Sequence, residues 1–249
     1  MSSKAPSYFS SLDGFEKLFS EGVPILNYHM IAPLPAEKKL KGLYAPPKSF
    51  ERHLAELRTA GFSFGSLDDI AEMRDNSQKR VVVSFDDGFL SVFENAMDAM
   101  ARHQCRAIQF LVPDFFGKSN EWDLVLGPEQ RPLMNASQVC EWVAAGHVIG
   151  SHTLTHPYLT RISREQAREE IGASRKKLED TFGVVVEHFC YPYGDFNEEI
   201  RQMVVDAGYR TACTVRFGVN RTGDDPFALC RIKGRHPTRK LKTLLKWFK

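Results

Sequence analysis

The segment KRVVVSFDDGF, residues 79–89, runs from three consecutive valines into two adjacent aspartates and a glycine. Such an apolar run is typical of a strand buried on both faces, as in a parallel sheet. Asp86 and Asp87 follow directly, at the strand end where α/β barrels carry their working residues. One of the two could instead cap the next helix while the other is solvated. Because neighbouring carboxylates repel each other, a bound cation would stabilise the pair.

Seven segments rich in apolar and β-branched residues recur along the chain, separated by segments of mostly helical periodicity. The alternation predicts a parallel sheet or barrel covered by helices. The expected strands are 23–31, 80–89, 106–116, 147–156, 186–194, 210–218 and 227–234. We therefore expect one irregular α/β barrel over 1–249, with a core at about 23–235, an N-terminal extension at 1–22 and a basic C-terminal helix at 239–249.

Helix ends are marked by short motifs. Three helices should end at Gly61, Gly146 and Gly208, each followed at once by a strand, because glycine tolerates the left-handed conformation of a helix stop. A Ser-x-x-Gln motif from Ser163 and an Asp-x-x-Glu motif from Asp195 predict capping boxes at two helix starts.

The composition is that of a soluble globular protein, with 43% hydrophobic and 26% charged residues. A net charge of +2 gives no support for nucleic-acid binding. Five widely spaced cysteines without a CxxC pair indicate reduced thiols. With neither a signal peptide nor a membrane span evident, we expect a cytoplasmic protein.

A histidine pair lies just after the strand residues HVI, at 147–149, in the segment 147–156. His152 and His156 are four residues apart, but Thr153 occupies the glutamate position of an HExxH motif, which excludes a zincin. Two histidines and one carboxylate can form an open zinc site. Alternatively, both imidazoles are hydrogen-bonded surface groups.

The stretch FCYPYG, residues 189–194, is a third strand end that leads into a tight turn. Pro192 fixes one dihedral angle and Gly194 permits close backbone approach. Such a turn can direct the backbone N–H of Tyr193 at a developing oxyanion. An ordinary turn with a packed aromatic ring is the alternative.

In this order and spacing, SFDDG, SHTLTH and YPYG resemble the first three motifs of the polysaccharide deacetylases, the NodB-homology or carbohydrate esterase 4 family. VPILNYHMI, FLVP and a closing RI extend the likeness over 23–235, which is closest in style to poly-N-acetylglucosamine deacetylases. The resemblance implies a distorted (β/α)7 TIM-like barrel that hydrolyses an N-acetyl group on an amino sugar.

The resemblance also assigns roles to residues. Asp87, His152 and His156 would hold one divalent metal ion, and Asp86 would be the general base. A His2Asp set suits zinc, although cobalt, nickel or iron could occupy it. The ion and the Tyr193 N–H would stabilise the tetrahedral oxyanion.

The chain departs from the family pattern in two places. Cys190 stands where many members carry an arginine that steadies the catalytic base, and Arg231 could replace that arginine. The Leu-x-His motif that supplies the general acid has no clean match. His236 is the nearest candidate, and an exposed tail histidine is its alternative.

Further residues are candidates for substrate contact. His29 ends the first strand, and Trp122 with Asp123 could line a sugar subsite together with Pro192 and Tyr193. The alternatives are a buried histidine bonded to backbone and an ordinary packed loop.

The tail at 239–249 places leucines and a phenylalanine on one helical face and lysines opposite. It could close the barrel, or it could be an interfacial helix attracted to anionic lipid. The second interpretation suits a lipid-linked or nucleotide-linked sugar, such as a precursor of lipopolysaccharide or capsule. Two other functions stay open: hydrolysis of a non-sugar amide, and carbohydrate binding by a pseudoenzyme that keeps the metal site.

Overall fold

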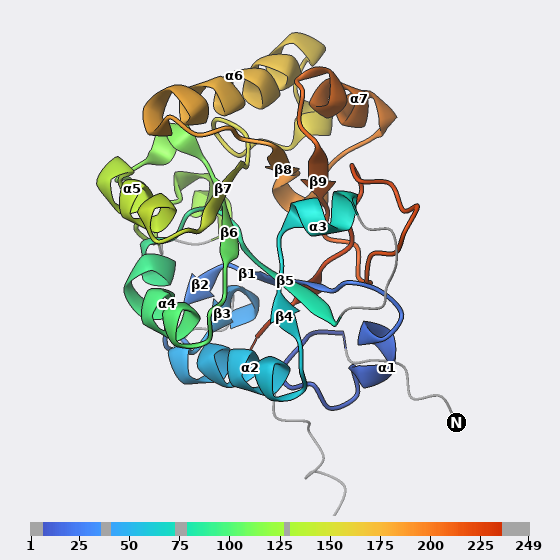
Figure 1. The fold of residues 1–249 in the computed structure, drawn as a ribbon. Helices are drawn as coiled ribbons and strands as arrows, with labels where there is room; N and C mark the ends of the chain where they lie inside the picture. Colours follow the sequence, from blue (N-terminus) through green and yellow to red (C-terminus); the bar gives the residue numbers. More distant parts are fainter. Residues whose placement is uncertain (1–6, 36–40, 73–78, 127–129, 236–249) are drawn as a thin grey trace, which may run out of the picture.

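A computed structural model describes residues 7–35, 41–72, 79–126 and 130–235. Parallel strands curl around a common interior and helices cover their outer side (Figure 1). The main sheet runs, in spatial order, β10 (Ile232–Lys233), β1 (Ile25–Tyr28), β5 (Arg80–Phe85), β6 (Ala107–Leu111), β7 (Val148–Ser151), β8 (His188–Cys190) and β9 (Thr211–Cys213), with β4 (Ser63–Phe64) beside β5. All seven expected strands are therefore confirmed, each shorter than its apolar segment.

The barrel is distorted because its two edge strands, β9 and β10, do not pair as a ladder. The chain before β10 closes the gap instead: the N–H of Thr214 donates to the carbonyl of Leu229 at 2.9 Å, and the N–H of Arg231 donates to that of Arg216 at 2.8 Å. This arrangement brings Arg231 into the barrel interior, where it is 3% exposed.

Long helices cover the sheet through apolar faces. In the helix at 47–59, Phe50, Leu54 and Leu57 are fully buried, as their spacing predicts. The helices are α1 (Glu16–Phe19), α2 (Pro47–Thr59), α3 (Leu67–Ala71), α4 (Leu90–Arg102), α5 (Ala136–Ala144), α6 (Arg164–Phe182) and α7 (Glu198–Asp206). Shorter elements are the strands β2 (Met30–Ile31) and β3 (Tyr44–Ala45) and the 3-10 turns η1 (Lys41–Leu43), η2 (Pro113–Phe115), η3 (Glu121–Leu126), η4 (Leu159–Arg161) and η5 (Pro192–Gly194).

The predicted helix stops are confirmed: Gly61, Gly146 and Gly208 have φ of 84°, 87° and 82°. The capping box from Ser163 is also confirmed.

The capping box from Asp195 is wrong. Asn197 caps α7 by accepting the N–H of Ile200 at 2.9 Å, while the carboxylate of Asp195 accepts the N–H and the hydroxyl of Thr160. The hydrogen bonds with Thr160 therefore occupy the carboxylate of Asp195, which the local motif predicts as the cap of the helix.

The hydrophobic core begins before the expected boundary at residue 23. Phe9, Phe15 and Phe19 are buried and pack on one another, with Phe9 at 5.4 Å and 5.7 Å from the other two rings. The N–H of Phe9 also donates to the carbonyl of Lys233 at 2.7 Å. The N-terminal segment thus helps to hold β10 in place.

Within the described residues, no helix combines the length and the apolarity that crossing a membrane requires. His236 and the tail at 239–249 lie outside the described part of the chain, so the predictions for both stay predictions.

Candidate active site

Strained backbone gathers at the carboxyl ends of β5, β7 and β8. Among the described residues, five that are not glycine have positive φ, and four of them lie here: Asp87 at 73°, Thr153 at 67°, His156 at 66° and Tyr193 at 59°. Such conformations cost about 1–3 kcal/mol each and persist where the surrounding structure enforces them. Their concentration at one edge of the barrel marks this edge as the functional one.

The predicted metal ligands lie together. Oδ1 of Asp87 is 3.5 Å from Nε2 of His152 and 3.3 Å from Nε2 of His156, and all three side chains are buried. Ligand atoms bound to one tetrahedral zinc ion at 2.0–2.2 Å lie about 3.4 Å from each other. The donor types and the two distances therefore fit a single divalent ion between these three atoms.

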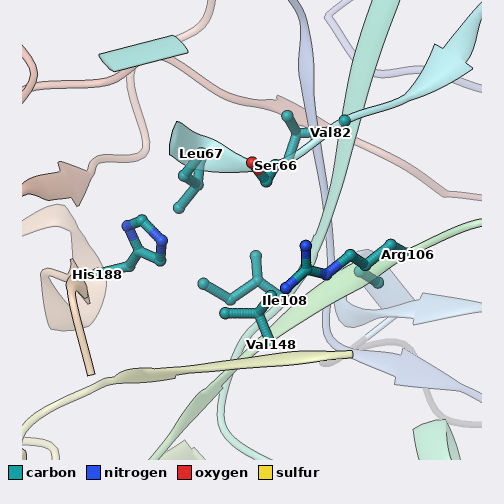
Figure 2. Close-up of a pocket in the computed structure, with 9 residues that line it drawn as sticks. Ser66, Leu67, Val82, Arg106, Ile108, Val148 and His188 are labelled. Carbon is teal, nitrogen blue, oxygen red and sulfur yellow. The ribbon is translucent and has the colours of Figure 1, made fainter. Parts of the chain in front are cut away.

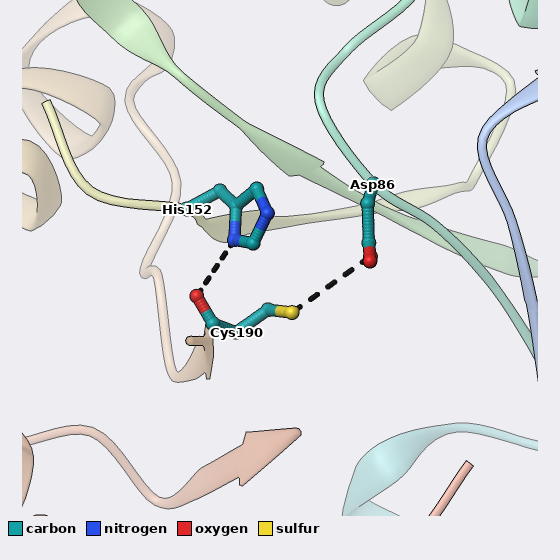
Figure 3. A group of neighbouring side chains, drawn as sticks. All are labelled: Asp86, His152 and Cys190. Carbon is teal, nitrogen blue, oxygen red and sulfur yellow. Dashed lines mark hydrogen bonds between the residues drawn. The ribbon is translucent and has the colours of Figure 1, made fainter. Parts of the chain in front are cut away.

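The orientation of His152 is set by a backbone carbonyl. Its Nδ1 lies 2.7 Å from the carbonyl oxygen of Cys190 (Figure 3). Because a carbonyl only accepts, Nδ1 carries a proton, and Nε2 is the ring nitrogen that faces Asp87 and that could bind an ion.

The charges of the triad favour a cation. Burial raises the pKa of Asp87, but hydrogen bonds from His152 and His156 hold that pKa well below its usual range. Burial lowers the pKa of His156. Burial lowers the pKa of His152 too, but Cys190, Asp87 and Asp86 together raise it well above its usual range. An ionised carboxylate and two imidazole nitrogens therefore face the space between them, and a cation bound there would take the place of the extra proton on His152.

Asp86 is paired with Arg231, which directly precedes the edge strand β10. Nη1 and Nη2 of Arg231 donate to Oδ1 and Oδ2 of Asp86 at 2.7 Å and 2.9 Å, and Nε donates to the carbonyl of Thr214. Burial raises the pKa of Asp86, but Arg231 with His29 and His152 holds it below its usual range. Asp86 is therefore a fixed carboxylate.

Neither aspartate caps a helix. The residue that precedes α4 is Phe89, and no side chain caps that end. The alternative that we kept open for Asp86 and Asp87 is therefore excluded.

Cys190 fills the space beside this ion pair. Its Sγ accepts from Nη2 of Arg231 at 3.1 Å and lies 3.8 Å from Oδ1 of Asp86 (Figure 3). An arginine at position 190 would overlap the guanidinium of Arg231, because both would contact the same carboxylate. The small side chain and the arginine from β10 are thus complementary.

The predicted substrate-contact residues surround the triad. His29 places Nε2 at 3.8 Å from Oδ2 of Asp86, and burial lowers its pKa. Asp123 is buried, accepts from Nδ2 of Asn120 at 2.8 Å, and has a pKa raised by burial. Both side chains can meet a ligand that reaches the metal ligands.

Two aromatic rings contact His156 directly. The ring of Trp122 is stacked on it at 4.7 Å, and the ring of Tyr193 meets it edge-on at 4.6 Å. Pro192, which precedes Tyr193, is buried. The direction of the Tyr193 N–H stays a prediction.

Asn27 and Gln109 are neighbours of Asp86 that we did not predict. Nδ2 of Asn27 donates to Oδ2 of Asp86 at 3.2 Å, and Nε2 of Gln109 donates to the backbone carbonyl of Asp86 at 3.3 Å. Each is an uncharged polar residue inside an otherwise apolar strand, which is the signal that could have identified it.

A second group of potential ligands, Asp68, Glu187 and His188, lies at the amino end of the barrel. Here Arg210 donates to Asp68 at 2.8 Å and to Glu72 at 2.7 Å, and it lies 3.5 Å from Glu187. The cation position among these carboxylates is therefore already filled by a guanidinium.

The cavity next to this group is small. Figure 2 shows Arg106, His188 and Ser66 around it, together with apolar side chains of the strand starts. Its volume of about 10 Å³ holds a single water molecule. A sugar cannot enter it.

A family model described as polysaccharide deacetylase matches residues 73–212. The chain belongs to the polysaccharide deacetylase family. It is 25% identical over 215 residues to the putative polysaccharide deacetylase YxkH of Bacillus subtilis, covering 85% of this chain and 71% of that protein. It is 28% identical over 129 residues to the peptidoglycan-N-acetylglucosamine deacetylase PgdA of Listeria monocytogenes, covering 51% of this chain but 24% of PgdA.

Solved structures of this family share the fold. IcaB from Ammonifex degensii superimposes with a TM-score of 0.75 at 25% identity, covering 88% of this chain and 93% of IcaB. The Streptococcus pyogenes deacetylase PplD gives a TM-score of 0.72 at 19% identity, covering 85% and 92%. The distorted barrel inferred from the sequence is therefore confirmed as the fold of the family.

Proposed function

We propose that this polysaccharide deacetylase uses a divalent metal ion to hydrolyse the N-acetyl group of an amino sugar in a glycan or glycan precursor. The observation that carries the proposal is the buried triad of Asp87, His152 and His156 beside the carboxylate of Asp86. The name of the relative PgdA, which states action on peptidoglycan N-acetylglucosamine, supports the substrate class. We assign the activity to one domain with its core in residues 23–235.

The ion would be held by Oδ1 of Asp87 and Nε2 of both histidines, and zinc suits this set best, with cobalt, nickel or iron as substitutes. Bound there, it supplies a Lewis acid that polarises the acetyl carbonyl and makes water a better nucleophile near neutral pH.

Asp86 is the proposed general base. Its carboxylate takes one proton from the attacking water while the hydroxyl adds to the acetyl carbon. Arg231 keeps Asp86 ionised and fixes the direction of its lone pairs through two hydrogen bonds. The N–H of Tyr193 donates to the oxyanion that forms on the acetyl oxygen.

Breaking the C–N bond releases acetate and an amine that needs one proton. His29 lies 3.8 Å from the carboxylate of Asp86, so it can pass the proton taken from water to the leaving nitrogen. His236, the general-acid candidate from the sequence, lies outside the described residues, and its role stays a prediction.

The pocket walls suit a sugar. Asp123 can accept hydrogen bonds from hydroxyl groups, and Tyr193 is 36% exposed beside the triad. For the tail at 239–249 we propose a peripheral contact with anionic lipid, which would suit a lipid-linked substrate.

The test combines metal analysis with product detection. Purified without chelator, the chain should contain close to one divalent ion and release acetate from N-acetylated glucosamine oligomers. Asp86→Asn should keep the ion and lose activity by about 10²–10⁴-fold, the usual contribution of a general base. Full activity in Asp86→Asn, or a protein that binds no divalent ion, would contradict the proposal. A panel that adds non-sugar acetamides decides the substrate class.

A further inference from the structure

The two histidines of the triad are held in different ways. Nδ1 of His152 donates to the carbonyl of Cys190 at 2.7 Å. Nδ1 of His156 is buried and has no hydrogen-bond partner among the described residues. Both rings nevertheless direct Nε2 at Oδ1 of Asp87. Something other than a hydrogen bond must therefore set the plane of the His156 ring.

Aromatic rings enclose His156 where a hydrogen-bond acceptor is missing. Trp122 is stacked on it with an interplanar angle of 23°, and Tyr193 lies nearly perpendicular at 73°. Both rings are themselves supported: Phe115 packs edge-on against Trp122 at 5.0 Å, and Tyr158 stacks on Tyr193 at 3.9 Å.

The stacked side chains form one row that leads from Arg161 to the triad. Arg161 lies over the outer face of the Tyr158 ring at 4.0 Å from its centroid, so both faces of that ring are occupied. One face of the imidazole is likewise covered, by Trp122. Trp122 thus packs against a metal ligand, which is a different role from forming the floor of a sugar subsite.

We propose that Trp122 and Tyr193 are positioning residues that fix the His156 ring for ion binding, doing for this ligand what the Cys190 carbonyl does for His152. The inference rests on the proposed metal function of the triad. Aromatic contacts of this kind stabilise beyond the burial of the rings and restrict rotation of the imidazole. Outer groups that orient metal ligands typically change metal affinity 10–100-fold when they are removed.

The test measures zinc affinity by competition with a chelating dye. Trp122→Ala should weaken zinc binding by about tenfold or more. Trp122→Phe should lose less, because a smaller ring remains, and Tyr193→Phe should match the wild type, because only the ring is required. The control is Phe217→Ala, which removes an exposed aromatic ring in the loop after β9 and should leave the affinity unchanged.

An unchanged affinity in Trp122→Ala together with a raised KM at saturating zinc would overturn the inference and restore the sugar-subsite role. If the alanine variant does not fold, as judged by its thermal transition, Trp122→Phe decides: an affinity equal to that of the wild type overturns the inference.

A second measurement is independent of the metal function. In metal-free protein, the ring protons of His156 should resonate upfield because of the Trp122 ring current, and they should shift downfield in Trp122→Ala. No difference in those resonances would overturn the proposed packing even if zinc binds. Failure of the wild type to bind zinc, with the ring-current shift present, would instead contradict the proposed function.

Discussion

Two groups of histidines and carboxylates lie at opposite ends of the same barrel, and each brings potential ligand atoms within 4.8 Å of one another. At the carboxyl end, Asp87 is buried and its partners in the triad are the imidazoles of His152 and His156. At the amino end, Asp68 is paired with the guanidinium of Arg210. Both groups thus bring potential metal ligands close together, but only the group at the carboxyl end leaves space for a cation.

The backbone conformations of the two groups also differ. Asp87 and His156 adopt left-handed conformations, which the surrounding structure must enforce. Asp68 lies inside the short helix α3, and His188 starts the regular strand β8. Strain is therefore concentrated where the proposed chemistry takes place, and the amino end serves the stability of the barrel, as is usual for such folds.

The largest effect is expected when the aspartate of each group is replaced and the two variants are compared. Asp87→Ala should abolish stoichiometric metal binding and lower deacetylation by at least about 1,000-fold, since a Lewis acid contributes several kcal/mol to such a reaction. Asp68→Ala should leave metal content and activity unchanged. Plasma emission spectrometry and acetate release measure both. Loss of the ion from Asp68→Ala would remove the distinction between the two ends.

Most of the catalytic end could be predicted from sequence because its motifs are local. The strand that ends in Asp86 and Asp87 is encoded by a continuous apolar run, and the four-residue interval from His152 to His156 brings both rings to one turn. Parallel strands then place both motifs at the same edge of the barrel.

Contacts between distant segments could not be predicted in this way. The resemblance offers Arg231 only as a possible replacement for the missing arginine, because Arg231 is 145 residues from Asp86 in sequence and its position depends on how the chain closes the gap between β9 and β10. Asp195 has a correct local capping pattern, yet Thr160 competes for its carboxylate. No local pattern in the sequence shows that Trp122 stacks on His156.

The second prediction tests the ion pair of Asp86, which is buried, whereas the ion pairs of Arg210 at the amino end are partly exposed. Arg231→Met should reduce the free energy of unfolding by about 3 kcal/mol, because it leaves a buried carboxylate without its charged partner. Activity should fall by about 100-fold while metal content is retained. Urea unfolding measures the loss of stability, and acetate release together with metal analysis measures the loss of activity at retained metal content.

The matched control for this change is Arg216→Met, which removes an exposed arginine from the loop after β9 and should alter neither quantity. If Arg231→Met kept wild-type activity, Arg231 would have no role in orienting the base.

A smaller effect is expected at the amino end from His147. Burial, with a contribution from Arg106, lowers the pKa of His147 to about 4, and its Nδ1 accepts the N–H of Ala107 at 3.3 Å. The unfolded chain takes up a proton near pH 6.5 while the folded chain stays neutral. Stability should therefore decrease as the pH falls from about 6.5 to about 4.

After allowance for its partial exposure, the contribution of His147 is about 1–2 kcal/mol. His147→Asn keeps an acceptor for Ala107 and removes the titrating group, so its unfolding free energy should change less between pH 7.5 and pH 4.5 than that of the wild type. Equal pH dependence in both proteins would contradict the assignment.

The smallest effect is expected from Arg210, the residue that makes the amino-end group unlike the triad. Its partners are about one third or more exposed, so Arg210→Met should cost about 1 kcal/mol of unfolding free energy or less, and the loss should shrink in 0.5 M salt, about where screening lengths fall below 5 Å. Metal content and acetate release should not change, because the guanidinium stabilises the barrel and takes no part in the chemistry. A drop in activity without a drop in stability would show that the two ends are coupled, and the division between a chemical end and a structural end would then be wrong.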